Sequence, residues 1–162
     1  MTPSYERLLT ALAEHDVEFV IIGAVALVLH GSARVTRDLD VCYSREPANL
    51  RRLAAALKPF APTLRGAPPD LPFVLDEPTL SAGLNFTLTC GAGDIDLLGE
   101  ITGVGAFRIV NRLSETMRVF ELDVRVLSLD GLERAKRATG RLKDLADLAE
   151  IQDIRRQRGP AR

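Results

Sequence analysis

One stretch, residues 19–41, limits the folds open to this chain more than any other. It begins with an apolar run typical of a buried strand (19–22), breaks at Gly23 and continues as an Ala- and Leu-rich segment with helical character. A second strand is expected next, and it carries Asp38 and Asp40. The order strand, tight turn, helix, strand predicts an α/β (α+β) domain built around a β-sheet.

The two aspartates suggest a metal site. Because successive side chains of a strand point to opposite faces, Asp38 and Asp40 are expected to present both carboxylates on one side. Proteins usually hold Mg²⁺ with one or two carboxylates and the phosphates of a substrate. The helix that starts near Gly23 offers backbone N–H groups to such phosphates. The stretch therefore predicts both halves of a metal-nucleotide site.

These residues resemble the signature of the nucleotidyltransferase superfamily, to which DNA polymerase β belongs. That signature is a hydrophobic residue, Gly, then Gly or Ser, a short gap, and Asp-hydrophobic-Asp-hydrophobic. The matching segments here are Ile22-Gly23-Ala24, a gap over 25–37, and Asp38-Leu39-Asp40-Val41. Ala24 departs from the pattern, because it keeps the backbone donors but lacks a hydroxyl that could contact phosphate.

Two further segments resemble small bacterial members of that superfamily, including those encoded in toxin-antitoxin and abortive-infection operons. One is 34–40, and the other is 136–148, where a lysine, a glycine break and an Arg-X-Lys-Asp-X-X-Asp-Leu motif follow one another. The resemblance implies a nucleotidyltransferase fold, a mixed β-sheet flanked by helices with C-terminal helices. We expect the core over residues 1–127 and a helical extension packed on it over 128–162.

The resemblance also implies a chemistry, the metal-dependent transfer of an NMP from an NTP such as ATP to a hydroxyl acceptor. Two Mg²⁺ ions, or Mn²⁺ in their place, would stabilise both ends of an in-line displacement. Asp38, Asp40 and Asp96 are the expected metal ligands and catalytic residues. Asp96 would also act as base or position the acceptor hydroxyl, and Asp94 is the second candidate for this role.

Six residues are expected to bind the nucleotide. Gly23 and Ala24 would let the helix N-terminus approach the β and γ phosphates. Four cations are candidates to neutralise phosphate or pyrophosphate: Arg34, Arg37, Lys136 and Lys143. For Arg37 an ion pair with Asp38 is an equal alternative, and for Lys143 the alternative is a salt bridge on the helix face.

The rest of the sequence predicts the elements around this site. Helices are expected over 5–14, 47–57, 106–113, 129–139 and 142–157, and strands over 85–90, 94–98, 117–120 and 124–127. The apolar face of the last helix is expected to comprise Leu145, Leu148, Ile151 and Ile154. Six prolines between residues 58 and 81 predict a long irregular loop. Arg65 in this loop is expected to be solvated, and a contact with a phosphate or substrate is the alternative.

Composition excludes several classes of protein. The chain has 162 residues, 46% of them hydrophobic, and a formal net charge of -1, which is typical of a soluble globular protein. Proteins that bind nucleic acid over many phosphates are usually basic, so any contact with RNA is expected to be local. The longest apolar run is too short for a bilayer and lacks a basic flank, so we expect a cytoplasmic protein without membrane contact.

Three functions remain open at this point. The first is an active transferase that uses an NTP and an RNA, protein or small-molecule acceptor, within a toxin-antitoxin pair or alone. The second is a catalytically degenerate nucleotide- or partner-binding domain of the same fold, in which Ala24 marks the loss. The third, an antibiotic-modifying transferase, is disfavoured because few residues remain after the core for an acceptor-binding domain.

Overall fold

A mixed β-sheet forms the centre of the molecule in the computed structural model, which describes residues 4–160. The strands are β1 (Phe19–Ile22), β2 (Leu39–Tyr43), β3 (Thr63–Leu64), β4 (Asn85–Cys90), β5 (Gly93–Leu98), β8 (Ser114–Val119) and β9 (Leu122–Leu127). They form one seven-stranded sheet in the order β3-β4-β5-β2-β1-β9-β8. Two short strands, β6 (Glu100–Ile101) and β7 (Gly105–Ala106), form a separate ribbon.

Helices flank the sheet, as the sequence predicts. They are α1 (Ser4–Glu14), α2 (Gly23–His30), α3 (Pro47–Leu57), the 3-10 helix η1 (Lys58–Phe60), α4 (Glu77–Ala82), α5 (Phe107–Arg112), α6 (Leu129–Thr139) and α7 (Leu142–Arg158). None of the helices between residues 4 and 160 is long and apolar enough to cross a membrane.

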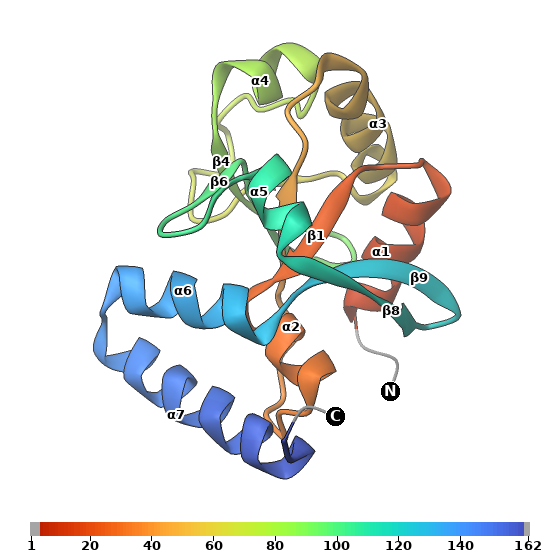
Figure 1. Ribbon diagram of the computed structural model, residues 1–162. Helices are drawn as coiled ribbons and strands as arrows, with labels where there is room; N and C mark the ends of the chain where they lie inside the picture. The colour runs from red at the N-terminus through yellow and green to blue at the C-terminus, as the bar shows by residue number, and fades with distance from the viewer. Residues whose placement is uncertain (1–3, 161–162) are drawn as a thin grey trace.

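The strand β1 lies near the middle of the sheet. It pairs antiparallel with β2 and parallel with β9, and β2 in turn pairs parallel with β5. All four residues of β1 are buried, as expected for a strand that is covered on both faces. Helix α1 packs against α3, β5 and β9, while α5 packs against β1, β2 and β9. The expected mixed sheet with flanking and C-terminal helices is confirmed (Figure 1).

The C-terminal helices α6 and α7 lie side by side, next to α2 (Figure 1). His30, at the end of α2, connects α7 to the sheet. Its Nε2 lies 2.8 Å from the Leu127 carbonyl oxygen, and its Nδ1 lies 3.0 Å from Nη2 of Arg158. An arginine can only donate, so Nδ1 accepts and Nε2 carries the hydrogen. Burial lowers the pKa of His30, which favours this neutral form.

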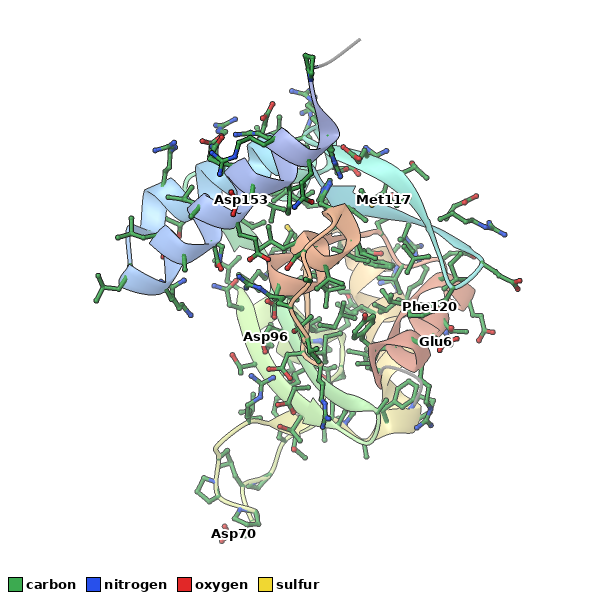
Figure 2. The ribbon with its side chains drawn as sticks, turned by 90° about the horizontal axis from the view of Figure 1, so that it is seen from below. Glu6, Asp70, Asp96, Met117, Phe120 and Asp153 are labelled. Atoms are coloured by element: carbon green, nitrogen blue, oxygen red, sulfur yellow. The ribbon has the colours of Figure 1, made fainter. Side chains whose placement is uncertain are left out.

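The prediction of an irregular loop over residues 58–81 is wrong at both ends. The segment contains η1, β3 and α4, and Pro59 and Pro78 lie in the first turns of the two helices. A helix needs no backbone N–H from its first residues, so proline is tolerated there. Between β3 and α4 the chain remains irregular, and Figure 2 shows it projecting from the sheet with Asp70 near its tip.

The predicted apolar face of the last helix is wrong at its N-terminal end. Leu145 is 57% exposed, whereas Ile151 and Ile154 are buried together with two acidic residues, Asp144 and Asp147. Cations from neighbouring elements bind both carboxylates, so they can be buried. The helix is therefore rotated so that its acidic side chains point inward.

The turn between β8 and β9 is also different from the expectation. Phe120 was predicted to end a strand, but it forms a two-residue turn with Glu121, and their φ angles are 49° and 62°. Its ring lies 5.9 Å from the ring of Tyr5, centroid to centroid. A two-residue hairpin loop with two positive φ values favours Asn or Gly. This sequence has neither residue there, so the turn is strained.

Replacing Glu121 with glycine is expected to stabilise the protein by about 1 kcal/mol, because glycine adopts a positive φ without a Cβ clash. Urea denaturation measures the change. The control is Glu115→Gly, at an exposed position of β8, where glycine weakens an ordinary strand. Equal destabilisation by both substitutions would contradict the assignment of strain to the turn.

Candidate functional site

A pair of carboxylates lies at the centre of the sheet. Asp40 of β2 and Asp96 of β5 are direct partners in the parallel register, so both side chains project from the same face. Burial raises the pKa of Asp40 to about 7, helped by the negative charge of Asp96, a hydrogen bond to it and the charge of Asp38. Near neutral pH Asp40 is therefore partly protonated when no cation is bound.

Gly23 lies directly against this pair. Its φ is +67°, and a Cβ added to it would lie 2.2 Å from Oδ2 of Asp40. No other residue type fits there unless the carboxylate moves. The glycine in the motif is therefore required by the close approach of α2 to Asp40.

The substitution Gly23→Ala is expected to destabilise the protein by roughly 2 kcal/mol, since it adds both backbone strain and a clash with Asp40. Thermal unfolding measures the loss. The matched control is Ala24→Ser, one residue along the same helix at a half-buried position with a negative φ. A Gly23→Ala protein as stable as the control would show that Asp40 can move away freely.

A cavity of about 390 Å³ opens above the carboxylate pair. The strands contribute carboxylates to the cavity wall, and the helices contribute cations. Negative and positive side chains therefore lie on opposite sides of the cavity. The charged residues that line it are Asp40, Asp96, Glu100, Lys136, Arg141 and Lys143. Gly23 lines it as well. Five of the predicted site residues therefore meet here.

The other predicted site residues lie outside this lining. Asp38 is exposed in the segment that leads into β2, although its charge reaches Asp40. Ala24 is half-buried in the first turn of α2, and Arg37 is exposed next to Asp38. Within residues 4–160 no three His, Cys, Asp or Glu side chains are grouped closely enough to hold a metal by themselves. Of the three predicted metal ligands, Asp40 and Asp96 are thus the two that the fold already places side by side.

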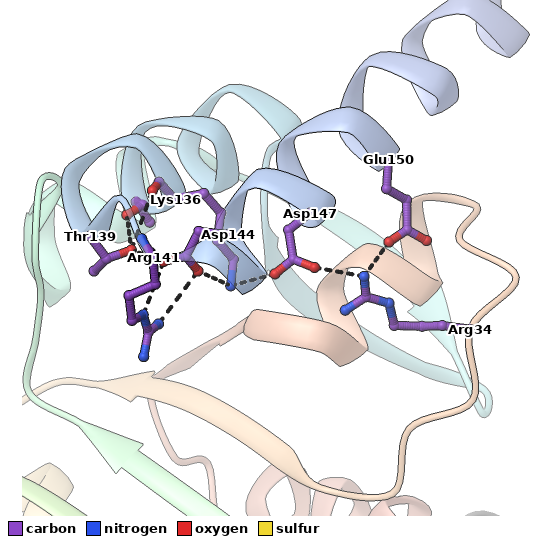
Figure 3. A network of polar contacts seen from close by, with 8 residues as sticks. Arg34, Lys136, Thr139, Arg141, Asp144, Asp147 and Glu150 are labelled. Carbon is purple, nitrogen blue, oxygen red and sulfur yellow. Dashed lines mark hydrogen bonds and ion pairs between the residues drawn. The ribbon is translucent and has the colours of Figure 1, made fainter.

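Two of the predicted nucleotide ligands, Arg34 and Lys136, are engaged in a network with α7 (Figure 3). Asp147 bridges them, since its Oδ1 lies 2.6 Å from Nη2 of Arg34 and its Oδ2 lies 2.8 Å from Nζ of Lys136. Glu150 also bonds to Arg34. Burial would raise the pKa of Asp147, but the bonds from Lys136 and Arg34 outweigh it and lower that pKa. Arg34 therefore fixes the segment before β2 to α7.

Asp144 continues the network at the start of α7 (Figure 3). Its Oδ2 accepts hydrogen bonds from the backbone N–H of Arg141 at 3.0 Å and from the Thr139 hydroxyl at 2.7 Å. Bonds from the Arg141 side chain and from Thr139 lower the pKa of this carboxyl. Asp144 thereby caps the helix. Lys143 forms no ion pair with any residue that the structure describes, and it is exposed at the edge of the cavity.

The sequence prediction missed Arg65. It was expected to be solvated, but its Nη2 donates to Oδ1 of Asp96 at 2.8 Å, and its Nε lies 3.2 Å from Oδ2 of Asp94. The residue follows β3, whose two residues pair with β4. Since so short a strand has no detectable alternation, the pattern of the sequence contains no signal for this contact.

Comparisons with known proteins identify the fold. No family model and no curated protein matches this sequence. Among solved structures, a nucleotidyltransferase-like protein from Thermotoga maritima matches with a TM-score of 0.59 and 15% identity, over 96% of each chain. The lincosamide antibiotic adenylyltransferase LnuA, solved with lincomycin, matches with a TM-score of 0.61 and 14% identity, over 96% of this chain and 98% of its own.

A third solved structure is that of ANT(2")-Ia in complex with adenylyl-2"-tobramycin. It matches with a TM-score of 0.60 and 12% identity, over 94% of this chain and 88% of its own. Because nearly all of LnuA is covered, an antibiotic adenylyltransferase needs no more chain than is present here. The expectation that such an enzyme requires an additional domain is therefore wrong. At these identities the likeness concerns the fold, and the resemblance seen in the sequence is confirmed at that level: this chain has the fold of the nucleotidyltransferase superfamily.

Proposed function

We propose that the protein transfers an NMP from an NTP to a hydroxyl acceptor. The observation that supports this most is the pair of Asp40 and Asp96 at the base of a cavity whose opposite wall carries Lys143, which has no carboxylate partner within residues 4–160. The ion-paired Lys136 and Arg141 line the same wall. A triphosphate needs a cationic surface and a site where a bound cation can meet its reacting phosphate. The fold, which two antibiotic adenylyltransferases also have, supports the same reaction class.

The donor set fits Mg²⁺ or Mn²⁺. Carboxylate oxygens are hard ligands, and one or two of them with substrate phosphates are the usual protein contribution to a Mg²⁺ site. Burial raises the pKa of Asp40 most, and the charges of Asp96 and Asp38 raise it further, so a bound cation would offset a negative charge that the free site disfavours. We propose that Asp40 and Asp96 hold the ions, two in number, with Asp38 as a further ligand. When bound, such ions neutralise the charge that develops on the phosphoryl, entering and leaving oxygens.

The remaining roles follow from position. The absence of a side chain at Gly23 leaves room for a phosphate beside Asp40, where the N–H groups of Gly23 and Ala24 start α2. Lys143, which has no carboxylate partner within residues 4–160, is the cation that we propose for the β and γ phosphates. Asp96 would accept the proton of the acceptor hydroxyl or orient that hydroxyl.

Arg34 and Lys136 have a supporting role in this proposal. Asp147 already balances their charges. Lys136 lines the helical wall of the cavity, whereas Arg34 lies outside the lining and attaches the segment before β2 to α7. The proposed boundary between a core (1–127) and a helical extension (128–162) runs through the site, because both parts line the cavity. Since its substrates are NTPs, we also propose a cytoplasmic location.

The proposals for an active transferase differ in the molecule that accepts the NMP. A small-molecule hydroxyl is supported by the comparison with LnuA, which has the same fold at nearly the same length. An RNA end or a protein hydroxyl, presented by a cognate toxin-antitoxin partner, is the other class. A catalytically degenerate binding domain is the second candidate function. Ala24 favours it, and so do the internal ion pairs of Lys136 and Arg141.

The test uses each NTP labelled on its α phosphate, with Mg²⁺, and panels of RNA oligonucleotides, proteins and hydroxylated small molecules. Labelled acceptor would establish the transfer and name the acceptor class. Binding of NTP without transfer to any acceptor, including proteins that co-purify, would favour the degenerate domain.

In the same assay Lys143→Ala is expected to raise KM for the NTP roughly tenfold, because it removes a charge-assisted contact to phosphate. Its melting temperature should stay close to that of the wild type, since the side chain is exposed. Lys58→Ala, at an exposed lysine of η1 outside this cavity, is the control and should change neither quantity. An unchanged KM in Lys143→Ala would remove this residue from the site.

A further inference from the structure

Arg65 is held in place by its own backbone. The strand β3 pairs with β4 through Thr63 and Leu64, and the N–H of Arg65 donates to the Thr87 carbonyl at 2.9 Å. The residue therefore extends the β3–β4 pairing by one step. This fixes where its side chain starts, even though the irregular segment to α4 begins immediately afterwards.

From that position the side chain crosses β4 and reaches β5. The Nη2 group donates to the Leu88 carbonyl and to Oδ1 of Asp96, both at 2.8 Å. The Nε lies 3.2 Å from Oδ2 of Asp94. The three charged side chains are only about one-third exposed, at 30%, 32% and 30% for Arg65, Asp94 and Asp96. The guanidinium thus donates hydrogen bonds to Asp96 and to one strand carbonyl, and it forms an ion pair with Asp94 without a hydrogen bond from Nε.

Asp96 lies on β5, between β2 and β4, and it has a different neighbour on each of these two strands. On the β2 side its register partner is Asp40, and on the β4 side it is Thr87, over which Arg65 reaches. Asp96 is therefore bound by a cation from one side and faces a second carboxylate on the other. Arginine suits this arrangement, because its rigid planar group holds Nη2 against Oδ1 of Asp96 while Nε faces Asp94.

We propose that Arg65 is a positioning residue, which orients Asp96 toward Asp40 and offsets part of the negative charge of the pair. In this role Arg65 sets both how tightly the site binds a divalent cation and how fast transfer proceeds. The first effect rests on the proposed cation site, and the second rests on the proposed transfer. The alternative is a purely structural contact that attaches the segment after β3 to the sheet.

The two roles differ in what Arg65→Ala does to metal binding. If Arg65 offsets the charge of Asp96, its loss leaves a more negative site, and Mn²⁺ should bind roughly threefold to tenfold more tightly. At the same time kcat should fall roughly tenfold to a hundredfold with KM for the NTP little changed, because Asp96 is no longer oriented. Tighter metal binding with slower transfer is not expected from a structural contact. Electron paramagnetic resonance of free Mn²⁺ gives the affinity without any measurement of activity.

Two further variants keep the test decisive if Arg65→Ala folds poorly. Arg65→Lys keeps the charge but loses the planar fork, so Mn²⁺ affinity should stay near the wild-type value while kcat falls. Asp94→Asn releases one side of the guanidinium and should lower kcat to a smaller extent. The control is Arg51→Ala on α3, an exposed arginine paired with Glu77, which should leave Mn²⁺ affinity and kcat unchanged.

The outcomes separate the two proposals. If the wild type transfers no nucleotide, the proposed function fails, and Mn²⁺ affinity alone decides the role of Arg65. Tighter Mn²⁺ binding by Arg65→Ala then still supports charge compensation at Asp96. Unchanged or weaker Mn²⁺ binding in folded Arg65→Ala overturns the inference, and so does wild-type kcat in an active enzyme.

Discussion

Replacing Asp40 with asparagine is expected to reduce nucleotide transfer by at least about a hundredfold and to raise the melting temperature of the metal-free protein at pH 8. The first effect follows from the proposed role of Asp40 as a metal ligand. The second follows from its environment, since burial, Asp96 and Asp38 raise its pKa from 3.8 to about 7. A residue that destabilises the free protein but is required for its activity is typical of a functional site.

The sign of the stability effect follows from proton linkage. The pKa of Asp40 is higher in the folded state, so ionisation lowers stability progressively between pH 3.8 and about 7, and the loss is complete above that range. The shift corresponds to at most about 4 kcal/mol, and solvent at this partly exposed carboxylate reduces it to roughly 2 kcal/mol. Asp40→Asn should therefore melt roughly 5 °C higher than the wild type at pH 8, and the gain should be smaller at pH 5.

The matched control is Asp123→Asn, in which the carboxylate is 68% exposed and pairs with Arg118 at the surface. It should leave both transfer and melting temperature close to those of the wild type. If Asp40→Asn transfers nucleotide at the wild-type rate, Asp40 is not a ligand in the reaction.

The second large effect is expected from Asp147→Asn. This carboxylate bridges Arg34 and Lys136 and is only 10% exposed, so its loss leaves two cations close together without their shared partner. We expect a destabilisation of roughly 3 kcal/mol, or a melting temperature lower by about 5 to 10 °C. Transfer should also fall, because Arg34 then fixes the segment that leads to Asp40 through Glu150 alone.

The dependence on pH checks the cause. The pKa of Asp147 is lowered in the folded state, so its contribution is complete above its ordinary pKa of 3.8 and is lost as pH falls through the folded value. The difference between variant and wild type should therefore shrink in acid. Asp153→Asn on the same helix, where the carboxylate is 59% exposed, is the control and should change stability by less than about 0.5 kcal/mol. A similar loss of stability in both variants would show that the bridge formed by Asp147 stabilises the protein no more than an exposed carboxylate does.

The sequence permits prediction of the parts of the site that depend on local structure. Gly23 and Asp40 lie in one strand-turn-helix-strand unit, and the backbone of that unit brings them into contact. Asp96 could be found because it lies on a strand with clear alternation, and it is the register partner of Asp40. In these cases the residue type and the short-range pattern contain the information.

The remaining contacts join residues that are far apart in the chain, and no periodicity reports them. Arg65 and Asp96 are separated by 31 positions, and Arg34 and Asp147 by 113. The same contacts explain the error at Leu145, because hydrophobic patterning assumes that buried positions are apolar. A buried carboxylate with two cationic partners breaks that assumption, and its partners become visible only once the chain is folded.

The most direct test of the account is calorimetric titration of the protein with non-hydrolysable analogues of the four NTPs, with and without Mg²⁺, in the wild type and in Asp40→Asn. We expect binding of at least one analogue to the wild type only when Mg²⁺ is present, and no binding to Asp40→Asn under the same conditions. At a hundred times its Kd such a ligand adds about 2.7 kcal/mol of stability, so a rise in melting temperature of roughly 5 °C or more should accompany it. Binding of equal strength without Mg²⁺ and in Asp40→Asn, or no binding under any condition, would contradict a metal-nucleotide site at Asp40 and Asp96.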